Sequence, residues 1–90
     1  MEKIIVMNAS DNVAIVMAAS LPKKSRFAVG DLQITAIDEI PFAHKVAIKP
    51  IHKGEHIFKY GEPVGIATTD IAPGEHVHIH NVISGRHTVK

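Results

Sequence analysis

Length, composition and charge place narrow bounds on this chain. Its 90 residues can form one small domain with a single hydrophobic core, but they leave no room for an enzyme-sized cleft and its supporting layers. We therefore expect a single domain over residues 1–90, with a disordered tail from about residue 84. Such a domain would need a partner for catalysis. Ten Lys and Arg residues are scattered among nine Asp and Glu residues, so the sequence predicts no nucleic-acid-binding surface.

The sequence contains no cysteine, which excludes disulfides, thiolate zinc sites and a cysteine nucleophile. A small domain without such cross-links must close its core by packing or by association. The apolar run within residues 1–7 is too short for a signal peptide, and no later run is long enough to span a membrane. We expect a soluble, unprocessed cytoplasmic protein that contacts neither a membrane nor nucleic acid.

Hydrophobic residues make up 46% of the chain but aromatic residues only 4%, so the core must be built from Val, Ile and Ala. Val and Ile favour strands, and no stretch shows helical periodicity. The turn at residues 10–12 has short polar side chains that can satisfy nearby backbone groups. Strands are expected at residues 3–8, 12–18, 32–38 and 44–49, and a solvated loop at residues 21–26.

The second half of the chain contains an internal repeat. Residues 51–57 read Ile-His-Lys-Gly-Glu-His-Ile and residues 71–77 read Ile-Ala-Pro-Gly-Glu-His-Val, so Ile, Gly, Glu and His recur. In each copy the glycine is expected in a tight turn that requires a positive φ. Between the copies, residues 58–67 predict two short strands around a corner, with Gly65 as a bulge or a point of close backbone approach. These features predict a compact, strongly bent all-β fold.

The most suggestive chemical pattern is Gly-Glu-His-Val-His-Ile-His-Asn at residues 74–81. If this segment is a β-strand, His76, His78 and His80 share one face, and the apolar residues between them share the other. Imidazole is the usual physiological acid–base group and the commonest metal ligand. Two imidazoles at i and i+2 can reach one cation, and an exposed strand face without a ligand is the alternative.

The histidine segment belongs to a larger set of motifs. The others are His-Lys-Val-Ala at residues 44–47, Lys-Tyr-Gly-Glu-Pro-Val-Gly-Ile-Ala at residues 59–67 and Asp-Ile at residues 70–71. Together these motifs resemble the SAF domain of the altronate dehydratase family, and the chain is similar to the small subunit, or a detached N-terminal domain, of such an enzyme. Ala43 departs from the glycine that is common in the family before the His-Lys pair.

The resemblance implies an all-β, SAF-type β-clip with short bent strands, tight turns and little or no helix. Enzymes of this family eliminate water from sugar acids such as altronate or galactarate, giving 2-keto-3-deoxy acids, with a divalent metal (Fe²⁺ or Mn²⁺) in the complete enzyme. Most of the active site lies in a large catalytic dehydratase subunit that this chain lacks. We therefore expect an accessory lyase subunit that contributes to a sugar-acid site in its partner.

The resemblance also places candidate functional residues. The catalytic candidates are His44, His78 and His80, the substrate-binding candidates are Lys45 and Asn81, and the candidate metal ligands are His78 and His80. His76 matches the family less consistently and ranks below them. Two of these residues have structural alternatives, since His44 can be a hydrogen-bonded structural residue and Asn81 can simply end a strand.

Other conspicuous residues have structural interpretations. Tyr60 is expected to pack its ring at a corner and to hydrogen-bond its hydroxyl. His52, His56 and His87 lack a supporting pattern and are expected at the surface.

Two further functions stay open. The chain could be a non-catalytic binding or assembly module, because a fold does not fix a function. It could also be the small subunit of a sulfolactate sulfo-lyase, since a related branch of the family eliminates sulfite from sulfolactate with similar motifs. Self-association into a homo-oligomer is compatible with each of these readings.

Overall fold

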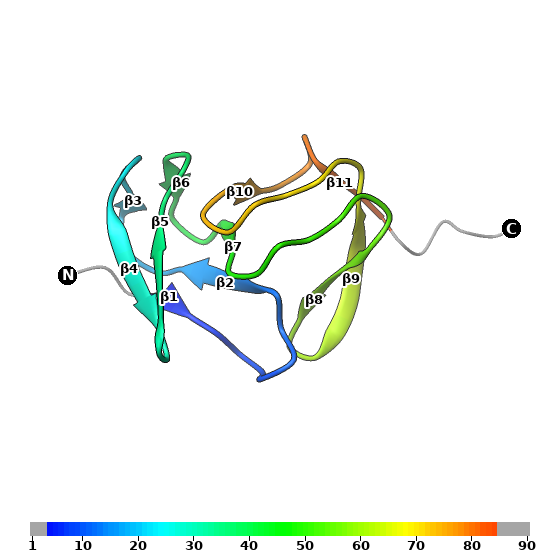
Figure 1. Cartoon of the computed structure of the whole chain (residues 1–90), viewed down its shortest axis with the longest axis horizontal. Coiled ribbons are helices and arrows are strands. Elements are labelled where there is room, and N and C mark those ends of the chain that lie inside the picture. The colour runs from blue at the N-terminus through cyan, green and yellow to red at the C-terminus, as the bar shows by residue number, and fades with distance from the viewer. Residues whose placement is uncertain (1–3, 85–90) are drawn as a thin grey trace, which may run out of the picture.

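The computed structural model describes residues 4–84, which form eleven short strands and no helix (Figure 1). The all-β prediction is therefore confirmed. The strands are β1 (Ile4–Ile5), β2 (Val13–Val16), β3 (Ser20–Leu21), β4 (Arg26–Val29), β5 (Leu32–Thr35), β6 (Ile40–Pro41), β7 (Lys45–Ala47), β8 (His56–Lys59), β9 (Glu62–Ala67), β10 (His76–Val77) and β11 (Val82–Ile83). No helix that could cross a membrane occurs in this part of the chain. His87, and almost all of the tail expected to be disordered, lie outside the described residues.

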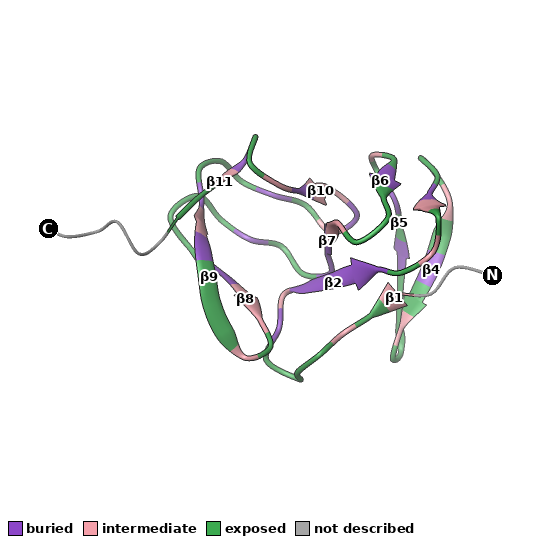
Figure 2. Cartoon of the chain, turned by 180° about the vertical axis from the view of Figure 1, so that it is seen from behind, coloured by how far each residue is buried: buried purple, intermediate pink, exposed green. Residues whose placement is uncertain are grey.

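A four-stranded antiparallel sheet, in the order β1-β2-β7-β10, runs through the middle of the molecule (Figure 1). β2 is buried along its whole length (Figure 2). Alternate side chains of a strand point to opposite faces, so Ala14 and Val16 enter one core while Val13 enters a second. The central sheet is therefore a wall shared by two hydrophobic cores.

The two cores lie on opposite sides of this sheet. The first is covered by the β3–β6 and β4–β5 pairs, and its buried members are Ala14, Val16, Leu21, Phe27, Ile34, Ala36, Ile40, Val46 and Ile48. The second is covered by the β11-β9-β8 sheet, and its buried members are Val13, Ala47, Ile51, Ile57, Ala67, Ile71 and Val77. Both are built from small aliphatic residues, as the composition predicts, with Phe27 the aromatic exception.

The two repeat copies pair with each other. Ile51 and Ile71 form an antiparallel bridge with N···O distances of 2.9 Å and 2.7 Å. In each copy the following turn is closed by a glutamate N–H that donates to the carbonyl three residues earlier, at 2.9 Å for Glu55 and 3.0 Å for Glu75. Because equivalent residues of the two copies pair with each other, the copies are related by local pseudo-two-fold symmetry.

Each repeat turn also binds the strand that precedes the other copy. The Gly54 N–H donates to the Ala67 carbonyl at 2.9 Å, and the Gly74 N–H donates to the Ala47 carbonyl at 2.8 Å. The two glycines have φ values of +90° and +94°, which confirms the predicted turns. A side chain at Gly74 would also place its Cβ 2.1 Å from the Thr35 carbonyl oxygen. The second copy is thus held tightly against β7.

The predicted strand over residues 74–81 is wrong beyond its first half. β10 contains only His76 and Val77, and the chain then turns, with the Asn81 N–H donating to the His78 carbonyl at 3.1 Å. Ile79 is 83% exposed instead of lying on a buried face. The Asn81 side chain causes this departure, because its Oδ1 accepts from the His78 N–H at 3.0 Å and offers the backbone an alternative to a sheet ladder.

The polar turn at residues 10–12 makes contacts that local sequence did not predict. Asn8 provides the local bond, since its Oδ1 accepts from the Ser10 N–H at 2.9 Å. Asp11 is only 1% exposed and reaches the β8–β9 turn, where its carboxylate accepts from the N–H groups of Tyr60 at 3.0 Å and Gly61 at 2.8 Å. The turn therefore joins the N-terminal segment to a hairpin far along the chain.

Two further sequence predictions have mixed outcomes. In the expected loop at residues 21–26, Lys23 and Lys24 are exposed in a turn, but Leu21 is buried in β3 and Arg26 begins β4. Strand β5 falls within the predicted strand at residues 32–38, but β4 was missed, because Phe27 is its one buried position among exposed or partly exposed residues. The close approach predicted at Gly65 is confirmed, since a Cβ there would lie 2.4 Å from Val82 Cγ1.

The turn between β6 and β7 holds Ala43 at a φ of +69°. This left-handed conformation costs a residue with a Cβ about 1–2 kcal/mol. We expect Ala43→Gly to raise the free energy of unfolding by about 0.5–1 kcal/mol, since glycine's greater freedom in the unfolded chain offsets part of the relief. Urea denaturation measures the change. Ala28→Gly, in β4 and without a positive φ, is the control and should be destabilising; a destabilised Ala43→Gly variant would contradict the strained turn.

Asp11→Ala would leave the Tyr60 and Gly61 N–H groups of the β8–β9 turn without their acceptor. Buried donors that lose a partner cost about 1–3 kcal/mol, so we expect the free energy of unfolding to fall by about that amount. The measurement is a denaturation curve compared with that of Asp31→Ala, whose residue is exposed. Equal stability of the two variants would show that the Asp11 bonds do not hold the hairpin.

Candidate functional site

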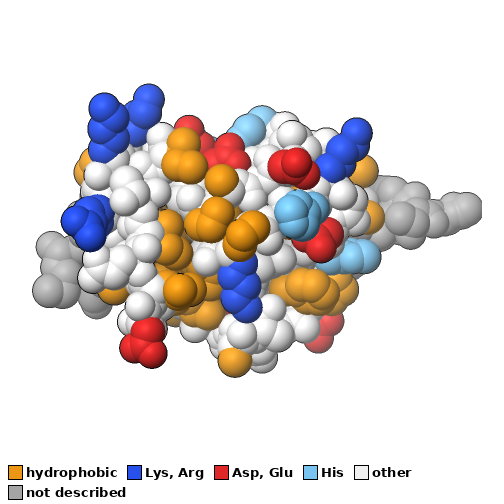
Figure 3. Space-filling model, viewed as in Figure 1, with side chains coloured by type: hydrophobic (Ala, Val, Ile, Leu, Met, Phe, Trp, Pro, Cys, Tyr) orange, Lys and Arg blue, Asp and Glu red, His pale blue; other side chains and the backbone are white. Residues whose placement is uncertain are grey.

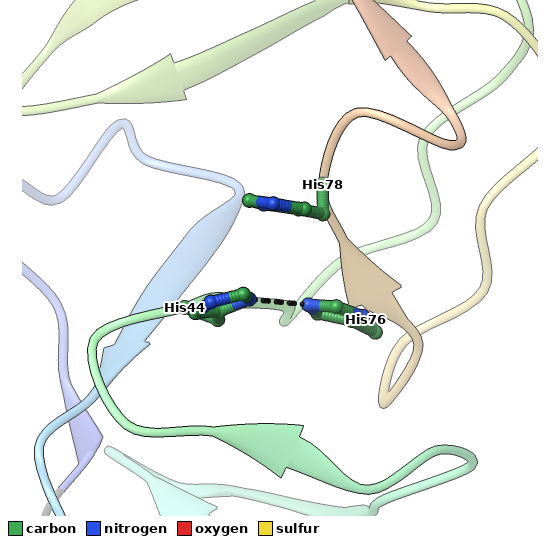
Figure 4. A group of neighbouring side chains, drawn as sticks. All are labelled: His44, His76 and His78. Atoms are coloured by element: carbon green, nitrogen blue, oxygen red, sulfur yellow. Dashed lines mark hydrogen bonds between the residues drawn. The ribbon is translucent and has the colours of Figure 1, made fainter.

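The pairing of β10 with β7 brings three histidines together. Val77 lies opposite Lys45 in this antiparallel pair. His78, which follows Val77, therefore lies opposite His44, which precedes Lys45. His76 is the first residue of β10. Figure 4 shows the three imidazoles converging, with His44 and His76 meeting at their ring nitrogens and His78 above them.

The three rings are in close contact. His44 Nδ1 and His76 Nε2 share a hydrogen bond of 2.8 Å, and the His44 and His78 rings stack with centroids 4.4 Å apart. One nitrogen from each ring lies within 4.8 Å of the others. All three side chains are partly buried. We call these three residues, His44, His76 and His78, the histidine cluster.

The histidine cluster favours uncharged imidazoles. A hydrogen bond between two ring nitrogens requires one of them to lack a proton. Burial lowers the pKa of His76, and the nearby His44, His80 and His78 lower it further, against an opposing effect of Asp38. Burial and the neighbouring His44, Lys45 and His80 also lower the pKa of His78. Neutral imidazole is the form that accepts protons and binds metals.

The other histidines lie outside the cluster. His80 is exposed, and its ring lies 5.2 Å from that of His76 at a tilt of 37°. The structure therefore groups His76, which the sequence ranked low, with two of the predicted residues and leaves His80 at the rim. The sequence signal for His76 was its place in the repeat. Its contact with His44 could not be predicted from the sequence, because it depends on the pairing of β7 with β10. His52 and His56 are exposed, as expected.

Asn81 organises the backbone that carries two of the histidines. It is 3% exposed, its Nδ2 donates to the His76 carbonyl at 2.9 Å, and its Oδ1 accepts from the His78 N–H. The Thr68 N–H donates to the Asn81 carbonyl at 2.9 Å. The side chain therefore faces the turn, and its contact with the histidines runs through their main chain.

A pocket of about 330 Å³ opens beside the histidine cluster, with His78 in its wall. The other polar residues of its lining include Lys45 and Lys59, and the apolar lining includes Ile57, Val64 and Val82. Burial lowers the pKa of the partly buried Lys45, and the charge of Lys59 lowers it further. The predicted residues Lys45 and His78 thus share one concave site.

Tyr60 differs from its prediction. Its side chain is 58% exposed, so it does not pack into the corner, and its backbone N–H makes the bond to Asp11. The Lys59 ammonium lies 5.2 Å from the centre of its ring, a cation–π contact at the edge of the pocket. On the face shown in Figure 3, Lys and Arg side chains are dispersed.

The donor set of the histidine cluster fits a transition-metal ion. Imidazole nitrogen suits Zn, Cu, Fe and Ni, and three protein ligands with an open position are typical of catalytic centres. The lowered pKa values of His76 and His78 keep these rings in the ligating form. The main-chain bonds of His76 to Asp38 and Asn81 fix the position from which its ring projects.

Comparison with known proteins gives concordant results. Residues 2–85 match the family described as the altronate/galactarate dehydratase SAF domain. The chain is 40% identical over 77 residues to the altronate dehydratase of Escherichia coli strain K12, covering 86% of this chain and 15% of that protein. It is 36% identical over 81 residues to the altronate dehydratase of Bacillus subtilis strain 168, covering 90% of this chain and 16% of that protein.

A shorter relative is the (2R)-sulfolactate sulfo-lyase subunit alpha of Paracoccus pantotrophus. The identity is 43% over 51 residues, which cover 57% of this chain and 76% of that subunit. The chain thus spans 15–16% of the length of the two altronate dehydratases, but most of the small lyase subunit. The resemblance indicated by the motifs at residues 44–47 and 74–81 is confirmed, and the chain belongs to the SAF domain family of the altronate and galactarate dehydratases.

Proposed function

We propose that this chain is the accessory SAF part of a sugar-acid dehydratase, and that the histidine cluster is its contribution to the active site. The observation that carries the proposal is the convergence of three imidazole nitrogens within 4.8 Å. The cluster is only partly buried, and the chain matches a small fraction of the altronate dehydratases, so the rest of the site belongs to a larger catalytic subunit.

The reaction is the elimination of water from a hydroxy acid. A base takes the proton from the carbon next to the carboxylate, and an acid protonates the hydroxyl on the following carbon, which leaves as water. The resulting enol becomes a 2-keto-3-deoxy acid. A divalent ion, Fe²⁺ or Mn²⁺, would supply Lewis acidity toward the departing hydroxyl or the carboxylate when bound. The residues of this chain that would hold it are His44, His76 and His78.

With the histidine cluster engaged in this way, His80 is the remaining histidine of the segment and keeps its predicted catalytic role. It is exposed beside His76, where a proton acceptor or donor could reach a substrate held between the two subunits. Asn81 acts as a positioning residue, because it holds the main chain of His76 and His78. Lys45 is the proposed substrate contact in the adjacent pocket.

A second candidate function is sulfite elimination from sulfolactate. It is favoured by the match to the sulfo-lyase subunit alpha of Paracoccus pantotrophus, of which this chain covers 76%. Assays of the reconstituted complex with altronate and with (2R)-sulfolactate separate the two reactions. Lack of turnover on either substrate in every pairing with a large subunit would favour the non-catalytic module.

Substitution of the histidines tests the catalytic assignment. In a complex with the large subunit, His44→Ala, His76→Ala and His78→Ala are each expected to lower kcat for altronate dehydration by at least about 10²-fold, and His80→Ala by about 10²-fold. The matched control is His56→Ala, which removes the exposed histidine at the equivalent position of the first repeat copy. Turnover as high as that of the control in all of these variants would refute the assignment.

Metal binding by the 90-residue chain distinguishes the ligands. Anaerobic isothermal titration with Fe²⁺, an ion that imidazole ligands suit, should show one site, which is lost in His44→Ala and His76→Ala and retained in His80→Ala. Asn81→Ala should weaken binding about 10-fold, because it loosens the main chain that positions two ligands. The opposite result, with binding lost in His80→Ala and retained in His76→Ala, would select the sequence-predicted pair of His78 and His80.

A further inference from the structure

Among the residues that the structure describes, two lysines and no acidic residue line the pocket beside the histidine cluster. Lys45 comes from β7 and Lys59 from the end of β8, and no Asp or Glu of the described chain lines the pocket. Among residues 4–84, the single ion pair within 4.0 Å is between His52 and Asp70, at the surface. Neither lysine is therefore neutralised from within this part of the chain.

We propose that this pocket binds a carboxylate through Lys45 and Lys59, and that it holds the acid group of the substrate. The identification of this carboxylate as a sugar acid rests on the proposed function. The preference for an anion follows from the pocket alone, because two like charges in a partly buried site repel each other. An anion bound between the two ammonium groups would offset this repulsion.

The surroundings strengthen this interaction. Ile57 is fully buried, and together with Val64 and Val82 it gives the pocket an apolar lining in which charge–charge attraction is less screened than in water. The wall is preformed, because β9 and β11 approach so closely at Gly65 that a Cβ there would meet Val82. The volume of about 330 Å³ lies within the range of small-molecule sites.

The position of His78 links the pocket to the histidine cluster. Its ring stacks on His44 and also lines the pocket. A carboxylate held by the two lysines would direct the neighbouring hydroxyl-bearing carbons toward the cluster, where the elimination is proposed to occur. Lys59 is also steadied by its contact with the Tyr60 ring, which leaves its charge available.

The test is a titration of the ¹⁵N-labelled 90-residue chain, followed by amide chemical shifts. The probes are D-altronate and the uncharged alditol D-altritol, which has the same hydroxyl pattern without the carboxylate. We expect altronate to shift amides of β7, β8 and β11 and to bind at least about 10-fold more tightly than altritol, the size of a charge-assisted hydrogen bond.

Lys45→Gln and Lys59→Gln should each weaken altronate binding about 10-fold. Lys49→Gln removes an exposed lysine just beyond β7 and should leave binding unchanged. Altronate binding that is equal in all three variants, equal affinity for altronate and altritol, or no shift of pocket amides at millimolar altronate would each overturn the proposal.

The outcome is separable from that of the proposed function. Lysine-dependent altronate binding in a chain whose complex fails to dehydrate altronate would sustain the carboxylate site and refute the dehydratase assignment. Dehydration that depends on the histidines but is unaffected by Lys45→Gln and Lys59→Gln would sustain the dehydratase assignment and refute the carboxylate site.

Discussion

The antiparallel pairing of Ile51 with Ile71 is the constraint on which the rest of this fold depends. Both side chains are buried in the second core, and each begins a turn whose glycine binds the strand before the other copy. Neither copy could hold its turn alone, because the acceptors of Gly54 and Gly74 lie on the strands that precede the opposite copy. A small domain without disulfides thus obtains its rigidity from a reciprocal arrangement of backbone hydrogen bonds around aliphatic side chains.

This arrangement brings histidines together in one copy only. The first copy places His56 in solvent beside β9, whereas the second places His76 against β7. The residue that precedes β7 is His44, while the corresponding residue twenty positions later is Val64. The same turn therefore brings two imidazoles together in one place and none in the other, and the Asn81 turn adds His78. The two repeat copies thus share one turn structure, but clustered imidazoles occur only at the second copy.

The histidine cluster and the pocket beside it adjoin each other. His78 belongs to both, and the exposed Ile79 and Ile83 lie in the pocket rim. A partly buried cluster of imidazoles beside two lysines that have no acidic partner among residues 4–84 is chemically incomplete, because it offers ligands and positive charge without a closed site that excludes water. This incompleteness supports the proposal that a larger subunit covers the site.

The sequence by itself determined the all-β class, the repeat with its two positive-φ glycines, the close approach at Gly65 and the family, because these depend on local turn chemistry and on contiguous motifs. Only the tertiary structure decided that β10 ends at Val77, that Asp11 holds a distant hairpin and that His76 joins His44. These features arise from hydrogen bonds between residues more than thirty positions apart, or from a side chain that competes with the sheet ladder. Strand alternation predicted His76, His78 and His80 on one face. The Asn81 turn and the β7–β10 pairing instead bring His76 and His78 together with His44.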